Sequence, residues 1–470
     1  MLLHQPLLRL PVRTAVKATT AGAVGFLIGI SVTAHAQPAP PMPSARALLD
    51  GYVVEAIRAN LALGQQRAQL DRANAALREA NGRFLPSLDF NARYSETSGV
   101  VNIGDFINPA YGALNQLIGQ PRFPTNINAT LPFKQESKLE VVLPLFNDGL
   151  RAARAAARAQ RDLVGSGRHG AMRQLAADVQ LSWLGYASLT QAVATLEATL
   201  PVLDENVRVS TRLIDAGHAT PDALLRARAE RSEFVQQLDD TRRQRDAARR
   251  SFNLLRDRDP DAEVTLTNDS TLLRVDSLAL TALVTNAMTG REELQQAASS
   301  LRLADAERRA ATAGYLPSLA FSASYGIQGN QYRVSNRDDV ALANLVFSWK
   351  LFSGGQVSAR REQAMALRTE AELRRREAER GVRLQVENAY DAVQSARLAL
   401  TSADDRHASA QRAFTLVQRR FAEGLASQVE FISARSAATS AAINQIITRF
   451  TFASRVVELE RAAALRTLPE

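Results

Sequence analysis

The chain has 470 residues, a formal net charge of +9 and no cysteine. Without cysteine, a disulfide framework, a thiolate metal site, a cysteine nucleophile and lipid attachment at an N-terminal cysteine are all excluded. The positive charge is almost entirely arginine interspersed with acidic residues, which is typical of solvated helix surfaces rather than of a nucleic-acid-binding patch.

The first 36 residues have the order of a secretory signal peptide. Basic residues precede an apolar run at 21–32, which ends in the small-x-small sequence Ala34-His35-Ala36. The run is too short for a comfortable membrane helix, so a cleaved signal is favoured over an N-terminal membrane anchor. We therefore expect residues 1–36 to be removed as the protein leaves the cytoplasm.

The first half of the chain is predicted to form helices around one pair of strands. In order, we expect a proline-rich flexible lead-in at 37–44, a helix at 45–84, a strand from 85 to 95, a long loop at 97–135, a strand at 137–146, a helix at 147–216 and a returning helix at 223–257. The Leu85-Pro86 step ends the first helix, because proline disfavours helical angles at the residue before it. Pro144 predicts a strand end or a bulge. Pro201 predicts a kink in a helix ~100 Å long.

The second half repeats this plan. After a linker at 259–276 we expect a helix at 277–315, a strand from 316 to 326, a loop at 328–341, a strand at 344–352, a second ~100 Å helix at 356–422 and a last helix to about 465. The spacing from Gly217 to Gly424 matches that from Phe146 to Phe352 to within one residue. An internal duplication, with repeat 1 at 45–258 and repeat 2 at 277–466, is therefore the primary prediction about the fold.

The predicted strands alternate between apolar and polar residues, so each has one apolar and one polar face. Four such strands cannot close a barrel, eight would be filled by their own side chains, and twelve from three chains would leave a lumen. The prediction is an α+β membrane protein whose four strands per chain contribute to a trimeric 12-stranded β-barrel, with a tube of very long helices beneath it. The alternatives, a soluble β-sandwich edge and a cytosolic coiled coil, account for the strands or the helices alone. The predicted lumen residues are Asp89, Asn91, Arg93, Lys138, Glu140 and Lys350, and the predicted membrane-interface aromatics are Tyr94, Tyr325 and Trp349.

Matching motifs in the two halves resemble the TolC-type outer membrane efflux protein family, also called outer membrane factors. The motifs are Leu-Pro-Ser-Leu at 85–88 and 316–319, Leu-Phe at 145–146 and 351–352, and the glycines Gly217 and Gly424. The resemblance implies a homotrimer in the outer-membrane lipid with a periplasmic α-barrel. It also implies docking on a periplasmic adaptor (membrane fusion) protein and on an inner-membrane transporter of the RND or ABC type.

The turns between the long helices are where such a channel would close and dock. The family pattern there is Gly-x-x-Ser/Thr-x-x-acid, and repeat 2 keeps it as Gly424, Ser427 and Glu430. Repeat 1 has Gly217 and Thr220, but its acid, Asp222, comes one residue early. The resemblance implies that Gly217, Thr220, Gly424 and Ser427 contribute to docking and that Glu430 and Asp222 face the pore aperture. The alternative is that each acid is solvated at a helix start.

No enzyme chemistry is expected. The match to G-x-G-x-x-G at 165–170 follows a helical run rather than a strand, and the histidines are isolated. We expect no cofactor, no metal and no nucleic acid. The leading hypothesis is an outer-membrane exit channel that passively conducts small molecules or drugs out of a tripartite efflux system. The alternatives are a duct for type I protein secretion and a non-conducting structural protein that spans the periplasm.

Overall fold

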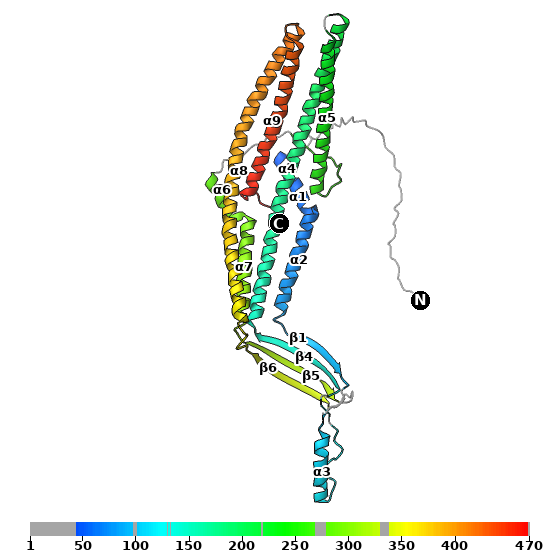
Figure 1. Cartoon of the computed structure of the whole chain (residues 1–470), viewed down its shortest axis with the longest axis vertical. Coiled ribbons are helices and arrows are strands. Elements are labelled where there is room, and N and C mark those ends of the chain that lie inside the picture. The colour runs from blue at the N-terminus through cyan, green and yellow to red at the C-terminus, as the bar shows by residue number, and fades with distance from the viewer. Residues whose placement is uncertain are drawn as a thin grey trace, which may run out of the picture. The chain divides into compact units, whose positions relative to one another are not determined.

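The computed structural model describes residues 44–96, 101–128, 130–131, 133–217, 220–267, 279–329 and 338–468. The predicted signal peptide, the lead-in up to residue 43 and part of the predicted linker lie outside these residues. The elements are α1 Ala45–Ala59, α2 Leu61–Gly82, β1 Ser87–Tyr94, β2 Val101–Asn102, α3 Gly104–Ile118, β3 Thr130–Leu131, β4 Gln135–Phe146, α4 Asp148–Asp215, α5 Pro221–Leu255, α6 Leu280–Gly290, α7 Glu292–Ala313, β5 Ser318–Gly329, β6 Asp339–Ser348, α8 Gln356–Ala422 and α9 Gln428–Ala462 (Figure 1).

Two repeats share one order of elements: two helices, a strand pair, a very long helix and a returning helix. The prediction of a single helix at 45–84 is wrong, because the chain breaks at Asn60 between α1 and α2. The Asn60 side chain accepts a bond from the Leu63 amide at 3.2 Å and donates one to the Leu255 carbonyl at 3.1 Å. The predicted helix at 277–315 is likewise divided at Arg291 into α6 and α7.

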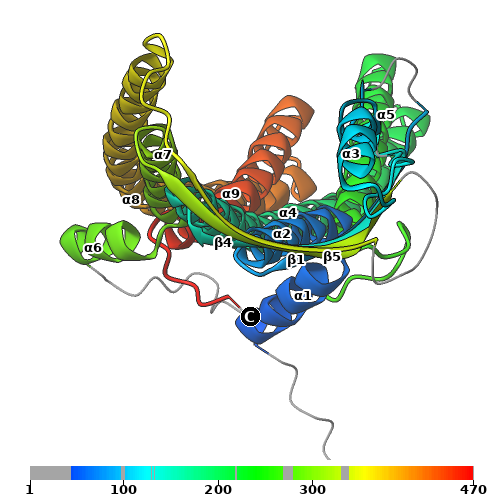
Figure 2. The ribbon, with the colours of Figure 1, turned by 90° about the horizontal axis from the view of Figure 1, so that it is seen from below.

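Helix α4 is the central element of residues 43–470. It packs against α1, α2, α5, α7 and α9, while α8 packs against α6, α7 and α9. Figure 2 shows the long helices and the sheet following one curve, with α1 and α6 on its outer, convex side. Burial of Trp183 and Phe252 holds the region around α1 together, and Trp183 Nε1 donates to the Thr265 carbonyl at 3.1 Å. Helix α4 continues through Pro201, and the kink expected there stays a prediction.

The four long strands form one antiparallel sheet in the order β1-β4-β5-β6. Strands from the two repeats meet at β4 and β5, so β1 and β6 are the edge strands of the sheet. The register shifts between Pro144 and Phe146, which confirms the irregularity predicted from Pro144. The predicted bounds of the last strand, 344–352, are wrong, since β6 is Asp339–Ser348.

The segment between β1 and β4 is more ordered than a loop. Its described residues contain the short β2–β3 pair and the 15-residue helix α3, so the long loop predicted over 97–135, whose order the sequence left open, includes regular secondary structure. Among the residues that the structure describes, no helix has the length and apolar content needed to cross a membrane.

Candidate functional site

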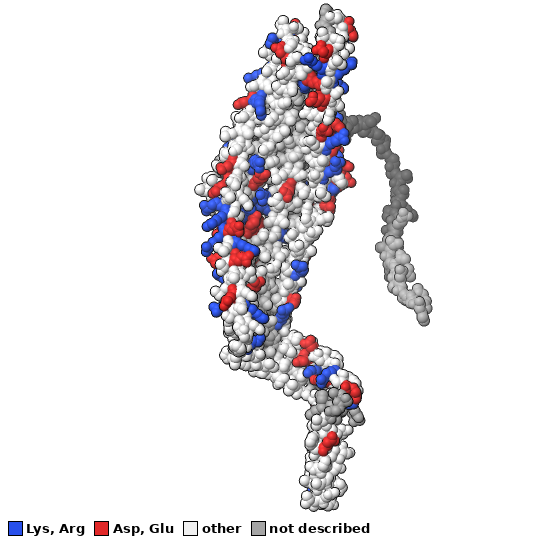
Figure 3. Space-filling view, in the orientation of Figure 1, with Lys and Arg blue, Asp and Glu red and all other residues white. Residues whose placement is uncertain are grey.

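One face of the sheet carries charged and polar side chains that lie opposite one another in register. We call this set the polar sheet face. It comprises Asp89, Asn91, Arg93, Glu136, Lys138 and Glu140. Arg93 and Lys138 both pair with Glu136, at 3.3 and 3.0 Å, and the Asn91 amide donates to Glu140 at 3.4 Å. Figure 3 shows the charges grouped on the sheet away from the long helices. All of the predicted lumen residues except Lys350 therefore lie together on this face.

Glu136 is a member of this face that the sequence prediction missed. The predicted strand began at residue 137, whereas β4 begins at Gln135. In the register Glu136 lies opposite Arg93. The alternation of polar residues at 136, 138 and 140 was a usable signal for including it.

The other face of the same strands is apolar and exposed. It includes Leu88, Phe90, Leu139, Phe321, Leu345 and Phe347. Tyr94 and Tyr325 lie on this face toward the strand ends that lead into the hairpin loops, and both are more than half exposed. An exposed apolar face opposite a charged one is the pattern of a strand between lipid and a wet interior.

Two predicted residues lie beyond the sheet. Trp349 and Lys350 follow the end of β6 at Ser348, so the prediction that Lys350 belongs to a lumen-facing strand is wrong. The last pair of the ladder is Ser318 with Ser348, and the residue before Ser318 is Pro317, which has no amide hydrogen to extend the ladder. Trp349 Nε1 donates to the Tyr315 carbonyl at 3.1 Å, which ties it to the helix-side end of the sheet.

The α4–α5 tip is the turn at which the first pair of long helices reverses. Helix α4 ends at Asp215, Gly217 follows in the turn with a φ of +72° that favours glycine, and α5 begins with Pro221. The Thr220 hydroxyl donates to Asp222 and does not cap the backbone. That hydrogen bond, with help from Arg226 at 3.6 Å, holds the pKa of Asp222 below its ordinary value. Asp222 is therefore an ionised carboxylate on an exposed tip.

The α8–α9 tip is built by a different set of bonds. Gly424 has φ +74°, and Arg420 donates to the Leu425 carbonyl at 3.1 Å. Ser427 and Glu430 form a capping box: the Glu430 amide donates to the Ser427 hydroxyl at 3.2 Å, and the Ser427 amide donates to the Glu430 carboxylate at 2.8 Å. Glu430 is therefore the third residue of α9 and remains exposed at the tip, and its place at the pore aperture stays a prediction.

Aromatic packing supports the α8–α9 tip from inside. The Phe421 and Phe431 rings stack at 4.7 Å, and Phe414 lies 5.8 Å from Phe431, which is buried. Because α8 and α9 each contribute to this cluster, their ends are held together beneath the turn.

Close to the tips, the two helix pairs are joined by polar links that sequence reasoning missed. Gln428 of α9 donates to the Ala223 carbonyl of α5 at 2.9 Å. Arg435 of α9 pairs with Glu230 of α5, with side chains only 7% and 14% exposed. The Arg435 guanidinium also lies over the Phe234 ring at 5.6 Å. A groove of about 530 Å³ runs between α5 and α9 along these residues. No local sequence pattern predicts these contacts between α5 and α9, because the partner residues are 205 positions apart in the chain.

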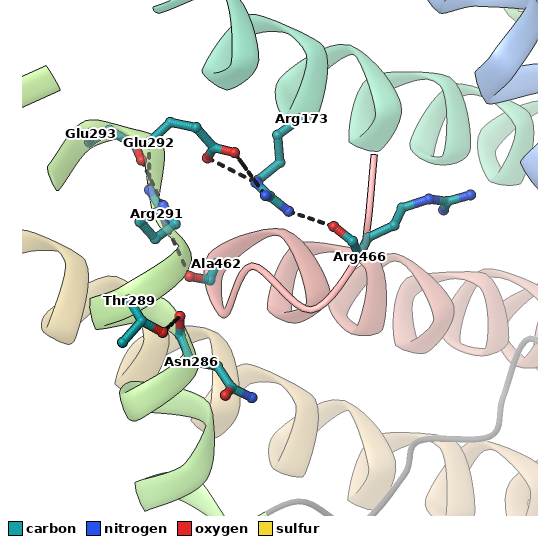
Figure 4. Close-up of polar contacts among 8 residues, drawn as sticks. All are labelled: Arg173, Asn286, Thr289, Arg291, Glu292, Glu293, Ala462 and Arg466. Carbon is teal, nitrogen blue, oxygen red and sulfur yellow. Dashed lines mark hydrogen bonds and ion pairs between the residues drawn. The ribbon is translucent and has the colours of Figure 1, made fainter. Parts of the chain in front are cut away.

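Far from the tips, an arginine network joins α4, α7 and the C-terminal segment (Figure 4). Arg173 donates to both Glu292 oxygens at 2.8–3.0 Å and to the Arg466 carbonyl at 2.9 Å. Arg291 donates to Glu293, to Gln385 and to the Ala462 carbonyl. These bonds join the start of α7 to α4, α8 and the end of α9.

Glu293 gives this network a measurable pH dependence. Burial raises the pKa of Glu293, but hydrogen bonds from Arg291 and the charge of Arg461 outweigh it, so the pKa lies below the ordinary 4.5. Its ionised form therefore stabilises the fold above pH 4.5, and this contribution is lost as the pH falls below that value. We expect Glu293→Gln to unfold at a temperature that depends less on pH between pH 5 and 3 than the parent does. If the melting temperatures of the two purified proteins fall by the same amount between pH 5 and pH 3, this expectation is contradicted.

The other sequence motifs form no site. The glycines of the 165–170 motif lie inside α4, with no strand before them, which excludes the context of a dinucleotide site. His169 and His407 lie on different helices, and in the described part of the chain no three potential ligands are grouped to hold a metal ion.

Comparisons with known proteins, one by sequence family and one by structure, both match outer membrane or membrane proteins. Residues 283–464, most of repeat 2, match the family model of the outer membrane efflux proteins. A membrane protein from Pseudomonas aeruginosa superposes with a TM-score of 0.74 and 18% identity, over 91% of this chain and 98% of that one. No curated protein sequence matches.

Two further solved structures share the fold. The outer membrane protein VceC from Vibrio cholerae has a TM-score of 0.73 and 17% identity, over 89% of this chain and 96% of its own. The CmeC outer membrane channel of Campylobacter jejuni has a TM-score of 0.72 and 15% identity, over 88% and 85%. The predicted resemblance is confirmed: residues 283–464 match the outer membrane efflux protein family, and the described residues share the fold of solved outer membrane proteins.

Proposed function

We propose that three copies of this chain form the outer-membrane exit channel of a tripartite efflux system. The observation that carries the proposal is the four-stranded sheet with one charged face, one exposed apolar face and two edge strands, each with one neighbour among the described strands. Exposed edges and an exposed apolar face are liabilities in water. A closed ring of three sheets removes both, since each β1 pairs with a neighbour's β6 and the apolar face meets lipid.

In this assembly the polar sheet face lines a water-filled lumen. Charge is concentrated in the first hairpin, because β5 and β6 offer Ser324, Gly326, Leu342 and Val340 at the same levels. Conduction in this proposal is passive, so solutes pass down their gradient. The lumen residues Asp89, Asn91, Arg93, Lys138 and Glu140 tune which charges pass.

The helices carry the other half of the proposed function. Helices α4 and α8 are 68 and 67 residues long. At 1.5 Å per residue each extends ~100 Å, enough to cross much of a periplasm. Their tips lie at the end away from the sheet, where an adaptor and an inner-membrane transporter of the RND or ABC type would dock. Gly217, Thr220, Gly424 and Ser427 shape that surface through their turns.

Uptake in cells tests the cargo. A strain lacking this chain should accumulate dyes and drugs, and the parental gene supplied on a plasmid should restore the parental level. Normal dye efflux with loss of a secreted polypeptide would instead support a type I secretion duct. If the purified trimer conducts ions but the deletion strain shows neither phenotype, the channel would stand, and both drug efflux and protein secretion would be rejected as its role.

The acids at the tips are proposed to set the charge of the aperture. Glu430→Gln keeps an oxygen for the capping box but removes the charge, so the helix start should persist. We expect weaker selectivity for cations over anions in planar bilayers, as a ring of three carboxylates is lost. Glu379→Gln, which removes a partly exposed acid in the middle of the long helix α8, is the control. Equal selectivity of all three proteins would remove Glu430 from the aperture.

A further inference from the structure

The helix α3 is held by its own return segment, which gives it a defined orientation. The Asn108 side chain makes two bonds of 2.8 Å with the backbone of Ile127, and the Asn115 side chain makes bonds of 2.7 and 2.9 Å with the backbone of Phe123. The Tyr111 and Phe123 rings lie 5.2 Å apart. One face of α3 is therefore covered by residues 119–128.

Two glycines make this hairpin possible. A Cβ on Gly104 would lie 1.8 Å from the Ile127 carbonyl oxygen, so only glycine allows the return segment to come this close. Gly119 has φ +66° and ends the helix in the left-handed conformation. The face of α3 that is left uncovered is consequently fixed.

That uncovered face has the residue spacing of a helix–helix seam. Phe106, Ala110, Ala113 and Leu117, the α3 seam, recur at intervals of four, three and four residues. This is the spacing of positions that meet a second helix in a coiled coil. Phe106 and Leu117 are 73% and 86% exposed. Residues 101–128 contain only two charged side chains, and the hairpin is almost free of charge in Figure 3.

We propose that the α3 helices of the three copies pack against one another through the α3 seam, over the outer mouth of the channel. The inference rests on the proposed trimer and names a contact within it. Helix α3 is inserted between β1 and β4, and β1 is the edge strand that would pair with the neighbouring copy. The α3 contact therefore continues an interface that the open sheet edges already require.

A second copy fits this face better than lipid does. Strands β1 and β4 have 8 and 12 residues. The 12 residues of β4 exceed the roughly 9–11 residues that a tilted strand needs to cross a hydrocarbon core of about 30 Å. Helix α3 follows their ends on the side away from the long helices, so it is past the membrane core. There an exposed apolar stripe needs a protein partner, and the small Ala110 and Ala113 let a second helix approach closely.

Disulfide trapping tests the contact directly, because the chain has no cysteine of its own. Leu117→Cys places a thiol in the seam. Gln116→Cys, the matched control, places one on the exposed flank of the same turn, about 100° away around the helix. Oxidising the detergent-purified proteins with copper phenanthroline should link Leu117→Cys into dimers at least roughly ten times faster than the control, since a disulfide needs Cα atoms within about 7 Å. With one thiol per chain, at most two of the three chains in each trimer can be linked.

The native mass of each variant separates the two proposals. A trimer in which Leu117→Cys and Ala113→Cys both link no faster than Gln116→Cys overturns the α3 contact and leaves the channel intact. A protein that is monomeric overturns both. A bimane probe attached to the thiol of Leu117→Cys reports on lipid contact in vesicles. Strong quenching of this probe by nitroxide lipids would place the face in lipid and overturn the α3 contact as well.

Discussion

Arg173→Ala is expected to lower the free energy of unfolding by about 3 kcal/mol. Arg173 and Glu292 are 13% and 7% exposed, so removing the arginine leaves a buried carboxylate without its bidentate partner. Breaking a buried pair in this way costs about 3–5 kcal/mol. The lower end applies because Glu292 is the first residue of α7, where the helix dipole contributes up to about 1 kcal/mol of compensation.

Guanidinium unfolding of the purified protein in detergent measures this loss, and two controls locate its cause. Arg375→Ala breaks an exposed pair within α8 and should change stability by less than about 0.5 kcal/mol. The double variant Arg173→Met with Glu292→Leu should regain most of the loss, because it leaves no charge unpaired. If Arg173→Ala unfolds within about 1 kcal/mol of the parent, the network does not hold α7 on α4.

Glu230→Ala is expected to loosen the tips, because Arg435 is then a buried cation with no carboxylate partner. Arg435 is 6% exposed and forms the ionic link between α9 and α5. Losing about 3 kcal/mol of local stability corresponds to roughly hundredfold faster amide exchange, if opening is local. Hydrogen exchange read by mass spectrometry should show this acceleration in the tip halves of α5 and α9, with the α1 region unchanged.

Glu233→Ala is the matched control for this prediction. Glu233 lies on the same helix, lines the same groove and is exposed, so the same charge is removed without uncovering a buried partner. Its exchange should equal that of the parent. Equal exchange in Glu230→Ala and Glu233→Ala would show that the α5–α9 contact does not depend on the ion pair.

The sequence predicted the features that depend on the spacing of nearby residues, namely the two faces of the sheet and the internal duplication. The alternation of Asp89, Asn91 and Arg93 with apolar residues identified the two sheet faces, because side chains in a strand alternate whatever the strand pairs with. The duplication followed from equal spacing of Gly217 and Gly424 within their repeats, and both have positive φ at a helix end. The trimer, its partners and the aperture stay proposals.

Features set by distant partners were missed. The break at Asn60 depends on a bond to the Leu255 carbonyl, and the end of β6 depends on where its partner β5 begins. Helix α3 was hidden because Asn108-Pro109 indicates a turn, whereas the structure uses Asn108 to bind the return segment. The link between Glu230 and Arg435 joins two repeats, so neither helix alone predicts it.

Single-channel recording of the purified protein tests the central claim most directly. The purified protein should have the native mass of three chains in detergent. Added to one side of a planar bilayer, it should insert and give discrete conductance steps that are selective for cations. Glu230→Ala should give larger or more frequent steps, since its tips are loosened. A trimer that inserts but stays silent, in the parent and in Glu230→Ala alike, would contradict the channel and support a periplasm-spanning structural protein.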